Sequence, residues 1–171
     1  MKPHNLVAQA RLETPLGPIT VAASAQGLAG LWFDGQAHHP GPLEAPVDAG
    51  QPFIAQAREE LERYWRGGQR GCFTVRLDAQ GTRFQQAVWR TLRDIPVGQT
   101  SSYAAVAAAA GSPAAVRAAG AAIGRNPLSI LVPCHRVLGH DGSLTGYAGG
   151  LHRKQALLRL EGALPALPLH A

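Results

Sequence analysis

Residues 101–127 read SSYAAVAAAAGSPAAVRAAGAAIGRNP, an alanine-rich stretch that decides the fold of the second half of the chain. Alanine is the strongest helix former, and glycines such as Gly111 and Gly124 favour the left-handed backbone at which helices end. One of the two leading serines can cap a first helix, while Ser112 and Pro113 suit the cap and the first position of a second. The pattern predicts two short helices joined by a tight turn, which is a helix-turn-helix.

The second of these helices carries one long polar side chain, Arg117, among small residues that include Ala115, Ala118 and Gly120. Such a helix can approach a surface very closely, and duplex DNA is a surface that it would fit. Backbone amides could then meet phosphates while Arg117 reaches between bases. A packed helical hairpin without a DNA partner is the alternative, because alanine also suits plain helix packing.

The composition is that of a globular, basic protein. Of the 171 residues, 46% are hydrophobic, and 16 Lys and Arg against 11 Asp and Glu give a net charge of +5. A positive charge favours polyanions such as nucleic acid, although it can serve solubility alone. The N-terminus lacks the apolar region of a signal peptide and no stretch is long enough to span a membrane. We therefore expect a cytoplasmic protein with no membrane partner.

The two cysteines, Cys72 and Cys134, are too few for the disulfide framework of a small secreted protein. Neither lies in a CxxC pattern, and His38-His39 stands in a Pro- and Gly-rich loop without a second pair of ligands nearby. We therefore expect no metal site. Cys72 reads as an ordinary small buried residue.

The first part of the chain differs in character from the rest. Its pattern predicts strands over residues 19–23, 28–33 and 72–77 and a helix from Phe53 to Trp65. From Thr82, which forms a capping-box pattern with Gln85, helical periodicity dominates. We expect an α+β protein, with a strand-rich α/β domain over residues 1–80 and a mainly helical domain over residues 81–171.

The stretch ILVPCHRVLG (residues 130–139) places Cys134 between a proline and a histidine. A free thiol is mostly protonated at neutral pH, so it needs a base or a favourable field to act as a nucleophile. His135 is adjacent, but consecutive side chains of an extended chain point in opposite directions. It can help only if Pro133 turns the chain or a water molecule links the two groups.

Two more residues after this stretch are unusual for their places. Tyr147 is an aromatic residue in a glycine-rich loop, where it either joins the core or lines a binding pocket. Glu161 follows the last predicted helix, where its negative charge opposes the helix dipole. It is tolerated there either because it is solvated or because it holds a cationic partner such as His135.

At this point the residues resemble the O6-alkylguanine-DNA alkyltransferases, also called methylated-DNA–protein-cysteine methyltransferases. The likeness extends over residues 82–162 and rests on Ile95-Pro96, Gly98, Thr100, Tyr103, Arg117, Asn126-Pro127, Pro133-Cys134-His135-Arg136-Val137, Tyr147, Gly149-Gly150-Leu151, Lys154, Leu157-Leu158 and Glu161-Gly162. It implies that the N-terminal part is the variable, ribonuclease H-like α/β domain of this family. It also implies an irreversible, single-turnover reaction that needs no cofactor.

The resemblance implies a set of catalytic residues. Cys134 would accept the alkyl group, His135 would act as the base through a water molecule, and Glu161 would orient the histidine. Asn126 would stabilise the turn that leads to the cysteine loop. Arg136 would have a structural role in that loop, as would the neighbouring Pro133.

The resemblance further implies a DNA partner, namely a duplex containing alkylated guanine, with O4-methylthymine as a further substrate. Arg117 would fill the gap left by an extruded base, and the small residues around it would allow DNA to approach. Tyr103 would crowd the 3′ phosphate and touch the bound guanine. Tyr147 would pack on the base, with backbone groups near Val137 and Ala148 reading its polar edge. We expect a monomer, and leave open whether it binds along DNA cooperatively.

Three other functions fit parts of the sequence. A catalytically silent protein that binds alkylation damage would have tryptophan in place of Cys134. A helix-turn-helix regulator would leave the Pro-Cys-His-Arg run unexplained, and a cysteine hydrolase would turn over repeatedly without DNA.

Overall fold

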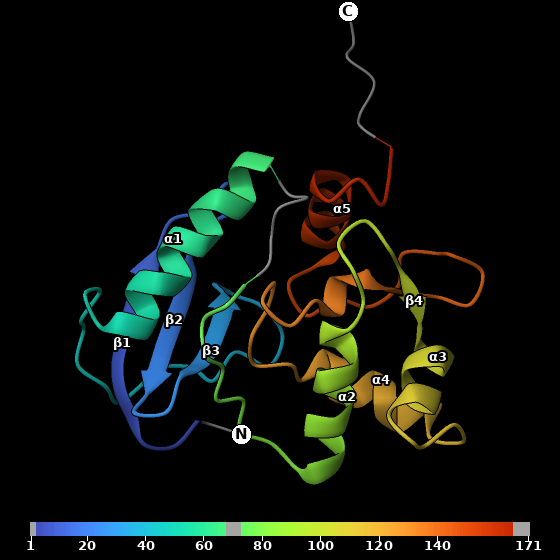
Figure 1. Ribbon diagram of the computed structural model, residues 1–171, viewed down its shortest axis with the longest axis horizontal. Helices are drawn as coiled ribbons and strands as arrows, with labels where there is room; N and C mark the ends of the chain where they lie inside the picture. Colours follow the sequence, from blue (N-terminus) through green and yellow to red (C-terminus); the bar gives the residue numbers. More distant parts are fainter. Residues whose placement is uncertain (1–2, 68–72, 166–171) are drawn as a thin grey trace, which may run out of the picture.

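The first half of the chain forms a three-stranded antiparallel sheet with one long helix packed against it (Figure 1). The computed structural model describes residues 3–67 and 73–165. The strands lie in the order β1 (Leu6–Leu12), β2 (Ile19–Ser24) and β3 (Leu28–Phe33), and the helix is α1 (Pro52–Gly67). Every residue of β3 is buried, as expected for a strand that is covered on both faces.

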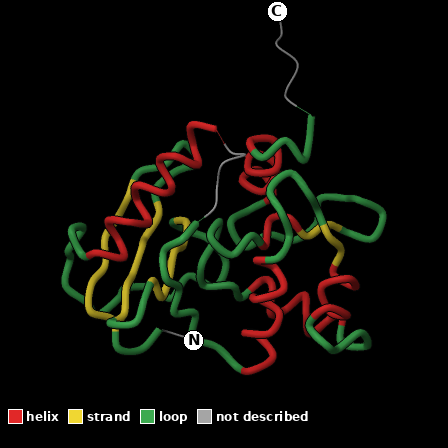
Figure 2. The backbone as a smooth tube through the Cα atoms, viewed as in Figure 1, coloured by secondary structure: helices red, strands yellow, loops and turns green. Residues whose placement is uncertain are grey.

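The second half is mainly helical, and Figure 2 shows its helices on the side of the molecule away from the three-stranded sheet. Its helices are α2 (Arg83–Arg93), α3 (Tyr103–Ala109), α4 (Val116–Gly124) and α5 (Leu151–Leu160). Two short parallel strands, β4 (Ser101–Ser102) and β5 (Val137–Leu138), pair beside them. The expected α+β architecture is present. Within the described ranges, no helix has the length and apolar character needed to cross a membrane.

The helix-turn-helix is present as α3 and α4, but α4 begins later than the sequence predicts. Ser102 caps α3, and Gly111 ends it with φ +80°. Ser112 does not cap α4; its carbonyl oxygen accepts a hydrogen bond from the Ala115 N–H (2.9 Å) and so closes a separate turn. The second helix therefore starts at Val116, without a side-chain cap. The capping box predicted at the start of α2 is confirmed.

Two strand predictions are corrected by the structure. Residues 73–77 form no regular strand, and only Leu77 pairs with the sheet, as an isolated bridge to Leu28. Cys72, at the start of that predicted strand, lies outside the described residues. The strand β1 was not predicted, because its inward-facing residues are the small Ala8 and Ala10, which give little hydrophobic alternation.

A short segment of the second half pairs with the edge of the sheet and joins the two halves. The Leu31 N–H donates to the Pro127 carbonyl oxygen (2.8 Å), and the Ser129 N–H donates to the Leu31 carbonyl oxygen (3.0 Å). Buried apolar side chains form one core across this junction. Because Cys134 follows only a few residues later, the sheet helps to position the cysteine loop.

Candidate active site

Cys134 begins a single 3-10 turn (Cys134–Arg136) that is buried between the two halves of the chain. Pro133, with φ −80° and ψ 62°, leads the chain into this turn. Because the chain turns here, the side chains of Cys134 and His135 are not forced to opposite sides as they would be in a strand. This meets one of the two conditions under which His135 could assist Cys134, namely that Pro133 turns the chain.

Asn126 holds the segment that leads to the cysteine. Its side-chain amide donates to the Val132 carbonyl oxygen (2.8 Å) and lies 3.1 Å from the Cys134 sulfur, while its Oδ1 accepts from the Leu128 N–H (2.9 Å). The side chain is almost fully buried. Asn126 thus fixes the turn and also presents a hydrogen-bond donor to the thiol.

Burial raises the pKa of the Cys134 thiol above its ordinary value. The Asn126 amide and the positive charge of Lys154 oppose this shift, because both favour the thiolate. Lys154 itself is fully buried, and its ammonium group donates to the carbonyl oxygens of Val137 and Thr145. Burial lowers the pKa of Lys154 to about 8, so it still carries its charge at neutral pH.

The two ring nitrogens of His135 have different surroundings. Nε2 lies 2.8 Å from Glu161 Oε1, whereas the buried Nδ1 has no hydrogen-bond partner among the described residues. Burial lowers the pKa of His135, although Glu161 works in the opposite direction. A neutral ring that donates from Nε2 to the carboxylate leaves Nδ1 as a basic lone pair.

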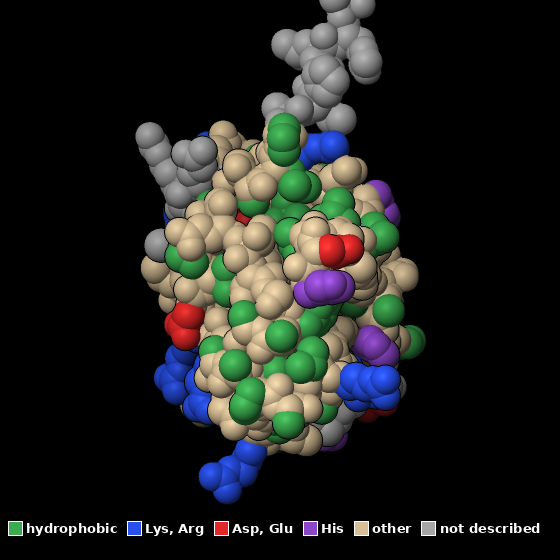
Figure 3. All heavy atoms as spheres, turned by 90° about the vertical axis from the view of Figure 1, so that its right-hand side faces the viewer, with side chains coloured by type: hydrophobic (Ala, Val, Ile, Leu, Met, Phe, Trp, Pro, Cys, Tyr) green, Lys and Arg blue, Asp and Glu red, His purple; other side chains and the backbone are tan. Residues whose placement is uncertain are grey.

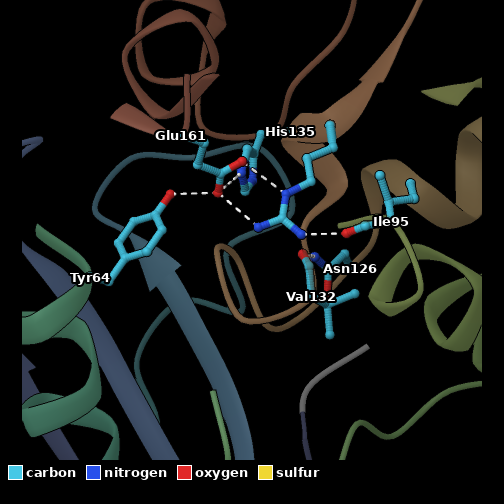
Figure 4. Close-up of polar contacts among 7 residues, drawn as sticks. Tyr64, Ile95, Asn126, Val132, His135 and Glu161 are labelled. Carbon is cyan, nitrogen blue, oxygen red and sulfur yellow. Dashed lines mark hydrogen bonds and ion pairs between the residues drawn. The ribbon is translucent and has the colours of Figure 1, made fainter. Parts of the chain in front are cut away.

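The carboxylate of Glu161 is the centre of a buried polar cluster (Figure 4). Oε1 contacts His135 and also accepts from the Tyr64 hydroxyl (2.8 Å) and from Arg136 Nη2 (2.9 Å), while Oε2 accepts from Arg136 Nε (2.8 Å). Burial would raise the pKa of Glu161, but the hydrogen bonds and charges of His135 and Arg136 hold it down at about 2. Glu161 is therefore tolerated at the end of α5 because it holds cationic partners, and not because it is solvated.

Arg136 also ties the cluster to the helical half. Its Nη1 donates to the carbonyl oxygen of Ile95, which follows α2, in addition to the two bonds to Glu161 (Figure 4). The side chain is only slightly exposed, so the guanidinium links three segments in a site nearly closed to water.

A cavity of about 250 Å³ lies beside Cys134 and opens to the surface. Tyr103 and Gly120 line one part of it, and Tyr147 and Ala148 line another. The ring of Tyr147 meets His135 edge-on, with 6.4 Å between the ring centres. Val137 is fully buried and does not line this cavity, and its carbonyl oxygen is bound by the ammonium group of Lys154.

The remaining predicted residues lie on the helix-turn-helix. The Tyr103 hydroxyl donates to the Thr145 carbonyl oxygen (3.0 Å), so this ring bridges α3 and the loop before Tyr147. Arg117 and Ala118 are exposed on α4, next to the half-buried Ala115. Figure 3 views the face that carries α3, where hydrophobic side chains lie among backbone atoms and other side chains, and Lys or Arg side chains lie mainly near the margins.

Two sequence profiles match successive parts of the chain. The first describes the ribonuclease-like domain of 6-O-methylguanine DNA methyltransferase and matches residues 8–79, and the second describes its DNA binding domain and matches residues 83–163. The chain belongs to the 6-O-methylguanine DNA methyltransferase family. The resemblance seen in the sequence is thereby confirmed.

Individual members of this family are similar over most of their length. A methylated-DNA–protein-cysteine methyltransferase of Mycobacterium tuberculosis is 44% identical over 150 residues, which are 88% of this chain and 89% of that protein. The corresponding protein of Methanosarcina barkeri is 43% identical over 153 residues, 88% of this chain and 94% of its own. The crystal structure of Mycobacterium tuberculosis OGT in complex with DNA matches with a TM-score of 0.83 and 41% identity, covering 92% of this chain and 94% of that one.

Two side chains of this methyltransferase site were not identified from the sequence. Tyr64 was placed in the apolar stripe of a helix, and helical spacing carries no sign that its hydroxyl reaches Glu161, 97 residues later. Lys154 was named only as part of the family resemblance, and its burial could not be foreseen because lysine side chains are rarely buried. Only the tertiary structure shows that both are buried beside the cysteine loop.

Proposed function

We propose that this methyltransferase removes O6-alkyl groups from guanine in duplex DNA by transferring them irreversibly to the sulfur of Cys134. The observation that carries the proposal is the arrangement of three buried side chains. A thiol, a histidine with a free Nδ1 lone pair and a carboxylate bound to the other ring nitrogen together supply a nucleophile, its base and a group that orients the base.

The reaction begins with removal of the thiol proton. His135 Nδ1 takes this proton through a bridging water molecule, and Glu161 stabilises the resulting imidazolium through Nε2. Asn126 and Lys154 favour the thiolate, which compensates in part for its burial. The positive charge that develops on His135 therefore forms next to a carboxylate that is ionised at all physiological pH values.

The thiolate then attacks the alkyl carbon in line with the bond to O6. A sulfur–carbon bond forms, the carbon–O6 bond breaks, and the proton held by His135 balances the charge of the departing guanine. The product is a thioether, which is a poor leaving group, so each chain reacts once and needs no cofactor. The same atoms would take a methyl group from O4 of thymine.

The alkylated base must leave the duplex to reach a thiol that is only 4% exposed. Arg117, exposed on α4, fills the gap in the stack, and Ala115, Ala118 and Gly120 allow the helix to approach the DNA backbone. Tyr103 and Tyr147 line the cavity that receives the base. We further propose that one chain acts as a monomer whose two domains divide near residue 80.

Intact mass measurement tests the proposal directly. The protein is mixed with a duplex carrying one O6-methylguanine, and the product is digested and mapped. We expect one added methyl group per chain, on the peptide that contains Cys134, and none with an unmodified duplex or with the Cys134→Ser variant. Tight lesion binding without a mass change would instead favour a silent damage-binding protein.

A further inference from the structure

The loop that follows β3 reaches across the domain junction to the cavity beside Cys134. Ala37 and His38, both on this loop, line the cavity together with residues of the cysteine half. We propose that the imidazole of His38 is a wall of this cavity that limits the size of the alkyl group transferred to Cys134. The inference rests on the proposed function and adds a residue that determines its substrate range.

The loop is fixed to its surroundings on both sides of His38. The Ala37 N–H donates to the carbonyl oxygen of Ala148, a residue of the cavity wall (2.9 Å). On the other side, the ring of His39 packs edge-on against Trp32, with 6.0 Å between ring centres.

The loop is also held at Gln36, the residue before Ala37. Its buried side chain accepts a hydrogen bond from the Ser129 hydroxyl (3.2 Å) and another from the Phe33 N–H (2.8 Å). The chain on either side of His38 is therefore bound to residues that do not belong to the loop.

The backbone of His38 indicates that its position is imposed by these ties. Its φ is +61°, in the left-handed region that residues other than glycine rarely adopt. This conformation costs about 1 kcal/mol or more in a non-glycine residue, and it persists only where the surroundings enforce it. The backbone of His38 is thus fixed at the edge of the cavity, and its exposed side chain forms part of the lining.

His38 lines two cavities. Besides the one at Cys134, it lines a larger cavity of about 480 Å³ whose wall also contains Trp32, Trp89 and Arg125. The smaller cavity, at about 250 Å³, has room for an extruded base with a small substituent. A benzyl group would need additional space, and removal of the His38 side chain would open such space towards the larger cavity.

The test compares single-turnover rate constants for O6-methylguanine and O6-benzylguanine at the same position of the same duplex. His38→Gly suits a φ of +61° and should leave the fold intact. We expect the ratio of the benzyl to the methyl rate constant to rise about tenfold, which is the discrimination that small volume changes in a pocket provide. His140→Ala, which removes an exposed imidazole that lines neither cavity, should leave the ratio unchanged. His38→Trp should lower the ratio.

The outcomes separate this inference from the function on which it rests. If the wild-type protein accepts neither group on Cys134, the proposed function is wrong and the inference fails with it. If the wild-type protein accepts alkyl groups but His38→Gly has the wild-type ratio, only the inference is overturned. Equal slowing of both substrates in His38→Gly would also overturn it, because His38 would then serve loop stability and not selectivity.

Discussion

The carboxylate cluster around Glu161 is buried and fully paired, whereas the exposed face of α4 is open to solvent. In the cluster, both carboxylate oxygens are paired, and the partners come from α1 and from the 3-10 turn that carries His135 and Arg136. On α4, small side chains and one exposed arginine leave the surface open. Groups that move protons must be held and desolvated, whereas a surface that receives DNA must stay accessible. Changes in the cluster should therefore affect folding and chemistry together, and changes on α4 should affect DNA substrates alone.

Glu161→Gln should have the largest effect. The substitution removes the negative charge that two buried groups share, and loss of one partner from a buried ion pair costs about 3–5 kcal/mol. We expect a decrease of that size in the free energy of unfolding, measured by denaturant titration, together with slower alkyl transfer. Glu62→Gln, on the exposed side of α1, is the matched control and should change neither quantity. Wild-type stability in Glu161→Gln would show that the cluster does not stabilise the fold.

Acid should weaken the wild-type protein through the same carboxylate. The pKa of Glu161 is about 2 in the folded chain, against an ordinary value of 4.5, so its contribution to stability is complete above about pH 4.5. This contribution is lost as the pH falls towards 2, because protonation breaks the bonds to His135 and Arg136. The stability of Glu161→Gln should vary less between pH 5 and pH 3 when both are measured by urea unfolding. Parallel curves for the two proteins would contradict the assignment.

Arg117→Ala tests the other side of the comparison. Extrusion of a base costs a few kcal/mol, so loss of the group that fills the gap should slow transfer from duplex O6-methylguanine about a hundredfold. Reaction with free O6-benzylguanine, which needs no extrusion, should keep its rate. Arg58→Ala removes an exposed arginine from α1 and controls for net charge. Equal losses on the duplex and on the free base would remove Arg117 from the extrusion step.

Local features of the fold were predictable, whereas contacts across the molecule were not. The capping box of Thr82 and Gln85 depends on residues three apart, and the structure contains it as predicted. The start of α4 was misplaced because residues 112–115 form a separate turn, closed by the Ala115 N–H and the Ser112 carbonyl oxygen, and the helix begins only after it.

The candidate site shows the same limit. Cys134 and His135 could be identified from their unusual neighbours, and Glu161 from its unfavourable place at a helix end. The hydrogen bond between Ala37 and Ala148 could not be predicted, because a backbone hydrogen bond does not depend on which side chains the two residues carry. Nor could the contact of Tyr64, whose position in a helical stripe indicated only that it is buried.

Tyr64→Phe should have the smallest effect, and it tests whether the N-terminal half influences the chemistry. The variant keeps the ring but removes one of the hydrogen bonds to Glu161, which keeps its other donors, so stability should fall by about 1 kcal/mol. The freed Oε1 should then bind His135 more strongly and raise the pKa of its ring, which titration by nitrogen-15 NMR would detect. Trp65→Phe, a neighbouring change on α1, controls for altered packing and should leave His135 unaffected. If His135 titrates identically in the wild type, Tyr64→Phe and Trp65→Phe, Tyr64 only joins the two halves of the chain. If the pKa of His135 rises in Tyr64→Phe alone, the sheet-bearing half adjusts the pKa of the base that serves Cys134.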